Sequence, residues 1–285
     1  MNLNEAVKWV AHWKTSALGL PGVICAGILA LLSLVPTATA QTNSAPKAEA
    51  KRSLATKAES PKPTAHTSSD IEGWQVRVDD RLLEPRYEAL LARALKFLES
   101  RLFDLKVLVA PDPLAKLQTV PIVLDSTHGK LRSMQYHPDA GWLRKNGYAT
   151  NLVKCVHIPV VADLVTARNI NQQPMVVLHE LAHAYHDQVL GFEEPRILKA
   201  YGAFKQSGHG EQALLYDGTR TRHYGLTDQK EVFAEMTEAY FGMNDFFPFN
   251  RAELMTAEPE IFELMQAIWG PVADVPRGQT TLRSR

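Results

Sequence analysis

The 285-residue chain has no excess of charge of either sign and almost no cysteine. Lysine plus arginine equals aspartate plus glutamate at 31 each, so overall charge gives no drive toward nucleic acid or an acidic partner. The two cysteines are Cys25 and Cys155, and Cys25 lies in an apolar N-terminal segment. If that segment is removed, Cys155 is the only cysteine left and no disulfide can form within the chain. The remaining protein must then be stabilised by its hydrophobic core.

The N-terminus has the pattern of an export signal. Lys8 and Lys14 precede an apolar segment centred on residues 17–35, and Pro36 and Ala38-Thr39-Ala40 follow it. This order predicts a signal peptide over residues 1–40, cleaved after Ala40, and a secreted or periplasmic protein. The alternative is a retained membrane anchor, because the apolar stretch approaches spanning length. Cleavage would leave no stable membrane insertion.

The remaining chain divides by composition. Residues 41–70 are rich in Ala, Ser, Thr, Pro and Lys and contain almost no large apolar side chains, which predicts a disordered linker. Residues 71–285 are predicted to form one α+β domain, with strands gathered in a small N-terminal part before a helical C-terminal half. The expected strands cover 74–82, 120–124, 152–161 and a hairpin, 214–216 with 219–224. The expected helices cover 84–109, 174–190, 194–204, 227–241 and 259–268.

The most informative segment is Val-Val-Leu-His-Glu-Leu-Ala-His-Ala-Tyr at residues 176–185. His179 and His183 are four residues apart and project from the same face of a helix. Two such imidazoles can bind one zinc ion at about 2.0–2.1 Å each. Glu180 lies beside the first ligand, where its carboxylate can accept a proton from a zinc-bound water. The alternative is a core helix without metal, but two His and a Glu on an apolar helix are costly to bury.

A catalytic zinc needs a third protein ligand and one open position. The extended metzincin pattern is excluded, because the chain has His186 and Val189 where that pattern needs Gly and His. A glutamate from a later helix is the alternative, and Glu231, Glu235 and Glu238 share one helical face. The alternative for Glu231 is a role at the N-terminus of the helix with Asp228, where the helix dipole favours acidic groups, and Glu238 is expected at a solvated surface position.

His-Glu-Leu-Ala-His at 179–183, Tyr224 and Glu231-Val-Phe-Ala-Glu235 together resemble the catalytic domain of the anthrax lethal factor-like zinc metallopeptidases, a zincin family that includes secreted bacterial proteins. The likeness spans residues 174–242. It implies a zincin-like fold, a zinc cofactor and peptidase activity. By the same resemblance Glu231 is the third zinc ligand and Tyr224 lies near the metal. The resemblance also implies that Glu235 contacts and supports one of the ligands without binding the metal itself.

The resulting hypothesis is a zinc peptidase acting on a peptide or protein substrate. Glu180 is the general base, and Tyr224 donates a hydrogen bond to the developing oxyanion, with His223 a weaker candidate for that role. His186 is expected in a supporting or rim position. Two alternatives remain: a non-catalytic zincin-fold adhesion or recognition module, and an amidase acting on cell-wall peptides. The intact Glu180 favours an enzyme.

Other features are interpreted as structural. His128-Gly129 and His137-Pro138-Asp139 are attributed to turn chemistry, and Cys155 to a buried, inert thiol. The strand that includes residues 153–159 is considered as an edge to which an extended substrate could pair.

Overall fold

A computed structural model describes residues 59–272 of the chain. The predicted signal peptide and residues 41–58 of the predicted linker lie outside this range. Between residues 59 and 272, no helix has both the length and the apolar character needed to cross a membrane.

The N-terminal half is built around a five-stranded mixed sheet with the order β1-β2-β3-β5-β4. Its strands β2, β3 and β5 are parallel, while the outer strands β1 and β4 run antiparallel to their neighbours. A separate two-stranded hairpin pairs β6 with β7. The strands are β1 (His66–Ile71), β2 (Trp74–Asp79), β3 (Ile122–Leu124), β4 (Gln135–Tyr136), β5 (Val156–Ile158), β6 (Ala213–Leu214) and β7 (Arg220–Thr221).

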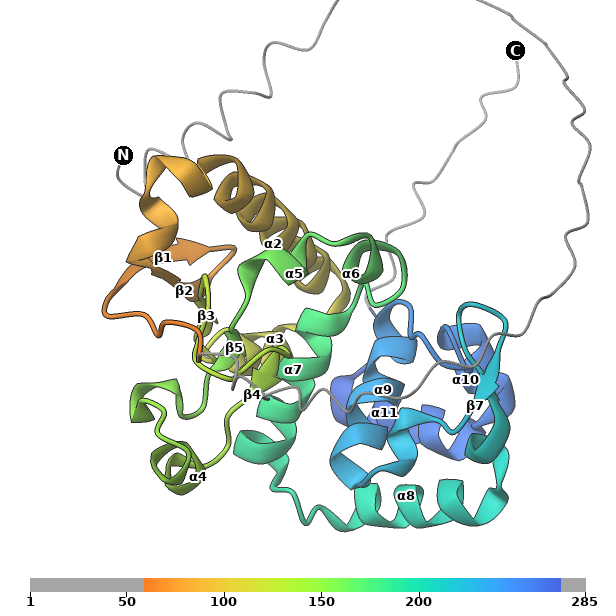
Figure 1. Cartoon of the computed structure of the whole chain (residues 1–285). Coiled ribbons are helices and arrows are strands. Elements are labelled where there is room, and N and C mark those ends of the chain that lie inside the picture. Colours follow the sequence, from red (N-terminus) through yellow and green to blue (C-terminus); the bar gives the residue numbers. More distant parts are fainter. Residues whose placement is uncertain (1–58, 273–285) are drawn as a thin grey trace, which may run out of the picture.

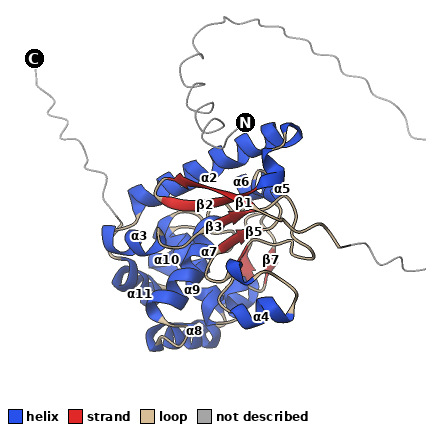
Figure 2. Cartoon of the chain, turned by 90° about the vertical axis from the view of Figure 1, so that its left-hand side faces the viewer, coloured by secondary structure: helices blue, strands red, loops and turns tan. Residues whose placement is uncertain are grey.

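Helices cover one face of the sheet and form the C-terminal half, so the described residues are mixed α and β as predicted (Figure 2). Figure 1 shows α7 between the sheet and helices α8–α11. The helices are α2 (Glu88–Leu108), α3 (Pro111–Leu117), α4 (Ala140–Lys145), α5 (Val161–Leu164), α6 (Ala167–Asn171), α7 (Val176–Tyr185), α8 (Pro195–Ser207), α9 (Gln229–Phe241), α10 (Arg251–Ala257) and α11 (Pro259–Trp269).

Side chains alternate along each strand, so the two faces of the sheet contact two different clusters of buried residues. Apolar residues such as Ile122, Leu124 and Val156 join α2 and α7 in the main core, which continues into α9 and α11. Val123 faces the other way, into a smaller cluster formed largely by the segment 131–155. Because side chains alternate along a strand, His157 of β5, the register partner of Val123, lies on this second face.

The structure corrects several predicted boundaries. The predicted linker ends too late, since residues 66–70 belong to β1, whose polar side chains carry almost no apolar signal. The predicted strand 152–161 shrinks to β5, because a 3₁₀ turn covers 150–152 and Lys154 has a positive φ of 58°. β5 also pairs with a strand on both sides, so it has no free edge for a substrate. The edge strands are β1 and β4, and β4 is the one beside β5.

Candidate active site

Helix α7 presents the histidine pair as the sequence predicts. The regular helix begins at Val176 and continues as a π-helical segment over residues 186–190, until Gly191 ends it with a φ of 83°. His179 and His183 lie on one face with their ring centroids 4.8 Å apart. Both are largely buried, at 9% exposure, because α7 packs between the sheet and α9.

Glu231 reaches the same point from the first turn of α9. Asp228 caps this helix by accepting hydrogen bonds from the backbone N–H groups of Lys230 and Glu231. Glu231 Oε2 then lies 3.1 Å from His179 Nε2 and 3.3 Å from His183 Nε2. Burial raises the pKa of the Glu231 carboxyl, but the hydrogen bonds with the two imidazoles outweigh it and hold that pKa well below its usual range.

These three side chains fit a zinc ion by donor type and by spacing. Two imidazole nitrogens and one carboxylate oxygen are a catalytic donor set of the kind that leaves a fourth position open. Tetrahedral ligands at about 2.0–2.2 Å from a common ion lie about 3.3–3.6 Å from one another. The separations of 3.1 and 3.3 Å are close to that range.

Glu238, predicted to be a solvated surface residue, is instead buried against the histidine pair. It is only 4% exposed, and its Oε1 lies 2.7 Å from His179 Nδ1. An imidazole that donates from Nδ1 to a carboxylate leaves Nε2 free to bind a metal. The prediction was wrong because every residue of α9 from 232 to 241 is buried, so Glu238 does not lie on the outer surface.

Glu235, expected to support a zinc ligand, lies farther from His179 than Glu238 does. Its Oε1 is 3.7 Å from His179 Nδ1, beyond hydrogen-bond distance. Burial and the neighbouring carboxylate of Glu238 raise the pKa of Glu235 well above its ordinary value, which favours its protonated form. Glu238 is therefore the direct hydrogen-bond partner of the His179 imidazole, and Glu235 is a more distant neighbour of the same nitrogen.

Glu180 faces the edge of the sheet. Its Oε2 accepts a 2.7 Å hydrogen bond from the backbone N–H of Tyr136 in β4. Burial raises the pKa of the Glu180 carboxyl, and a more basic carboxylate is a better proton acceptor. Sequence periodicity gave no sign of this contact, because β4 has only two residues.

The three aromatic candidates are placed differently from one another. Tyr224 is 48% exposed, and its ring centroid lies 6.4 Å from that of His179. His223 is fully buried, and its Nδ1 accepts a hydrogen bond from the backbone N–H of Gly225. His186 is also fully buried and packs against Phe192 and Phe233. Only Tyr224 lines the cavity beside the histidine pair, so neither His223 nor His186 has its expected role.

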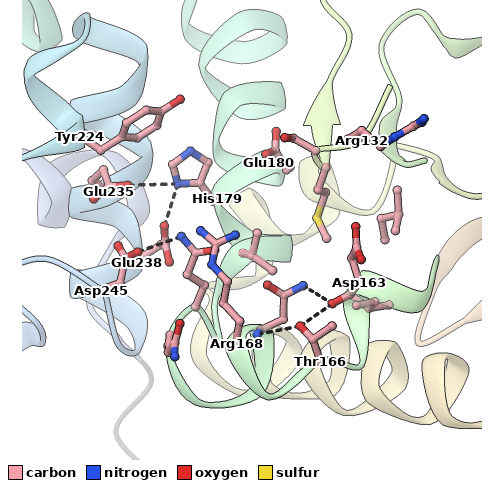
Figure 3. Close-up of a pocket in the computed structure, with 18 of the residues that line it drawn as sticks. Arg132, Asp163, Thr166, Arg168, His179, Glu180, Tyr224, Glu235, Glu238 and Asp245 are labelled. Atoms are coloured by element: carbon pink, nitrogen blue, oxygen red, sulfur yellow. Dashed lines mark hydrogen bonds and ion pairs between the residues drawn. The ribbon is translucent and has the colours of Figure 1, made fainter. Parts of the chain in front are cut away.

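A cavity of about 840 Å³ opens in front of this group. His179, Glu180 and Tyr224 line it beside the carboxylates of Glu235, Glu238 and Asp245 (Figure 3). Arg132 and Asp163 lie across the cavity from this group, whereas Arg168 extends toward Glu238 and Asp245 (Figure 3). Ile158 at the end of β5 and Pro159 directly after it also line the cavity. Its volume lies in the upper part of the range of small-molecule sites, so it can hold several substrate groups beside the histidines.

Comparisons with protein families, with curated proteins and with solved structures found no match to this chain.

Proposed function

We propose that the chain is a secreted zinc-dependent peptidase of the zincin type, which hydrolyses peptide bonds with Glu180 as general base. The observation that carries the proposal is the convergence of His179, His183 and Glu231, beside a large cavity that His179 and Glu180 line. The export step rests on the sequence pattern of residues 1–40.

The three converging side chains would hold the ion, and Glu238 would fix the His179 ring through Nδ1. Zinc bound in this way supplies a water whose pKa is lowered to about 7. Glu180 accepts a proton from the water that attacks the peptide carbonyl, then returns it to the leaving amine. The backbone N–H of Tyr136 orients the Glu180 carboxylate for this transfer.

Tyr224 is assigned to the developing oxyanion. Its ring lies beside His179 on the cavity wall, and its hydroxyl is a hydrogen-bond donor at neutral pH. Burial raises the pKa of Tyr224, which keeps the hydroxyl protonated. A donor aimed at a forming oxyanion contributes to transition-state stabilisation.

The direct test is Glu180→Gln, measured against the wild type with a pool of fluorescence-quenched random peptides and with zinc analysis of both proteins. We expect unchanged zinc content and a loss of turnover of about 10²–10⁴-fold, the contribution of a positioned general base. Glu193→Gln is the matched control, because Glu193 is exposed and lies just beyond the same helix. Its turnover should equal that of the wild type.

Three outcomes would contradict the proposal in different ways. Equal cleavage by Glu180→Gln would rule out the assigned base. Stoichiometric zinc without cleavage of any peptide would favour the binding-module alternative. Release of fragments from purified cell-wall material, without cleavage of the peptide pool, would identify the amidase.

A further inference from the structure

A second cluster of histidines surrounds one buried carboxylate, that of Asp125. Its Oδ2 lies 2.6 Å from His128 Nδ1 and 2.7 Å from His157 Nε2, and its Oδ1 lies 2.7 Å from His66 Nε2. A fourth imidazole extends the network, since His137 Nε2 lies 3.1 Å from His157 Nδ1. Asp125 and His157 are fully buried, and His128 and His137 are each 3% exposed.

The cluster and the candidate active site lie on opposite faces of the sheet and share no residue. Asp125 directly follows β3, His157 belongs to β5 and His66 begins β1. His128 follows in the segment after β3, where Asp125 N–H bonds to Ile158 O. Three stretches of chain, at residues 66, 125–128 and 157, therefore meet at one carboxylate.

Among residues 59–272, Asp125 forms no ion pair with a lysine or an arginine, and its partners are all histidines. The charge of Asp125 acts on Arg81, but the Arg81 guanidinium forms its ion pair with Asp79 and also donates to Thr127 O.

We propose that Asp125, His128 and His157 form a second metal site, which takes a divalent transition-metal ion of the zinc class and has a structural role. One oxygen of Asp125 and one imidazole nitrogen each of His128 and His157 would bind the ion, a set that suits Zn²⁺ and its neighbours. These three atoms already lie within 4.8 Å of one another, and none is exposed. A closed site needs a fourth ligand, and His66 Nε2, which lies 2.7 Å from Asp125 Oδ1, would supply it. A dication there would compensate the charge of the buried carboxylate, which has no Lys or Arg ion-pair partner between residues 59 and 272.

His137 acts as a positioning residue for this site. Its Nε2 can accept a hydrogen bond from His157 Nδ1 once His157 Nε2 binds the metal. Metal ligands in proteins commonly have such partners, which fix the tautomer and the ring orientation. The present separations of 2.6 and 2.7 Å must widen by about 0.7 Å to admit an ion with tetrahedral ligands.

An ion at the Asp125 site would stabilise the sheet and would not take part in chemistry in the cavity. Residue 157 is the register partner of Gln135 in β4, the strand whose next residue holds Glu180. An ion at Asp125 would therefore join β1, β3 and β5 behind the cavity edge without facing the cavity. The inference stands without the proposed peptidase activity, because neither site supplies a ligand to the other.

The test is metal stoichiometry of the purified full chain, loaded with Zn²⁺ or Co²⁺, dialysed and analysed by elemental mass spectrometry. We expect two ions per chain for the wild type and one for His179→Ala/His183→Ala. Asp125→Asn should also hold one ion, and combining all three changes should leave none. His209→Ala is the matched control, because His209 is an exposed imidazole paired with Glu258, and this variant should hold two.

The wild type and the His179→Ala/His183→Ala variant decide the matter even if Asp125→Asn does not fold. No ion in that double variant would overturn the second site, as would an Asp125→Asn protein that holds as many ions as the wild type. One ion in the wild type, kept in the double variant and lost in Asp125→Asn, would support this site and contradict the first. The absorption of the Co²⁺ protein would then show whether the ion is tetrahedral.

Discussion

The two histidine clusters use the same side-chain chemistry on opposite faces of one sheet, and they differ in access. The group of His179, His183 and Glu231 meets a cavity of about 840 Å³ through His179, and Glu180 and Tyr224 line the same cavity. The group around Asp125 is sealed, with its central carboxylate and His157 fully buried. A catalytic metal needs an open position, whereas a structural metal site is closed. The two proposed roles therefore differ in how accessible the metal would be to substrate and water, and not in the type of ligand.

The largest expected effect comes from a substitution at the site beside the cavity. His183→Ala removes a ligand of the proposed catalytic zinc and should lower peptide turnover by at least about 10⁴-fold, because activation of the water and the general base are lost together. Asp125→Asn should retain turnover per folded molecule within about threefold. It should instead lower Tm by about 5–10 °C, since it disrupts a buried charged network.

Turnover and thermal unfolding are measured on the same preparations of both variants. The comparison fails if Asp125→Asn loses activity at a temperature where circular dichroism shows it folded. It also fails if His183→Ala lowers Tm as far as Asp125→Asn does while it still cleaves peptide.

A second prediction separates two glutamates one turn apart on α9. Glu238→Gln should weaken zinc binding at the candidate active site by about 10–100-fold, because it removes the carboxylate that holds His179 Nδ1. Glu235→Gln should change zinc affinity by less than about threefold, because Glu235 is already inclined to be protonated and lies 3.7 Å from that nitrogen.

Zinc competition with a chromophoric chelator, in the Asp125→Asn background, isolates this site from the second one. Equal weakening by both substitutions would show that the two carboxylates act as one unit. Stronger weakening by Glu235→Gln would reverse the assignment made from the geometry.

The contrast also shows what the sequence can predict. His179, Glu180 and His183 lie on one helix, so their i, i+4 spacing alone places them on a common face. Glu231 lies on a later predicted helix, 227–241, and only the family resemblance favours it over Glu235 and Glu238 as the third ligand. The burial of Glu238 could not be predicted, because helical spacing defines a shared face and does not say which element covers it.

The Asp125 cluster gave no local signal at all. His66, Asp125 and His157 meet only because the strand order brings β1, β3 and β5 together, and that order depends on long-range pairing. Taken singly, His128 and His137 look like turn residues. Strand β1 was assigned to the linker for a related reason, since only its last residue, Ile71, is buried.

The smallest expected effect tests whether histidine burial alone marks a metal site. His186 is as buried as His157, yet neither of its ring nitrogens has a hydrogen-bond partner, and its ring packs against Phe192 and Phe233. Burial lowers its pKa to about 4. A base whose pKa is depressed in the folded state stabilises that state above its ordinary pKa, and the contribution is lost as pH falls toward the folded value. The titratable groups that act on it are His183, Lys230, Asp187 and Asp228.

His186→Phe should therefore raise the midpoint of chemical unfolding relative to the wild type at pH 5, and by less at pH 8. The difference grows as pH falls from about 6.5 toward 4, because only the wild type must keep an uncharged imidazole in an apolar pocket. His223 and His137 titrate in both proteins and cancel in the comparison. Zinc content should stay the same in the two proteins. If the difference in unfolding midpoint did not change with pH, the His186 imidazole would take up its proton as readily in the folded protein as in the unfolded one. Loss of zinc in the variant would mean that His186 contributes to the metal site, so that burial without a carboxylate partner is enough to recruit a histidine to it.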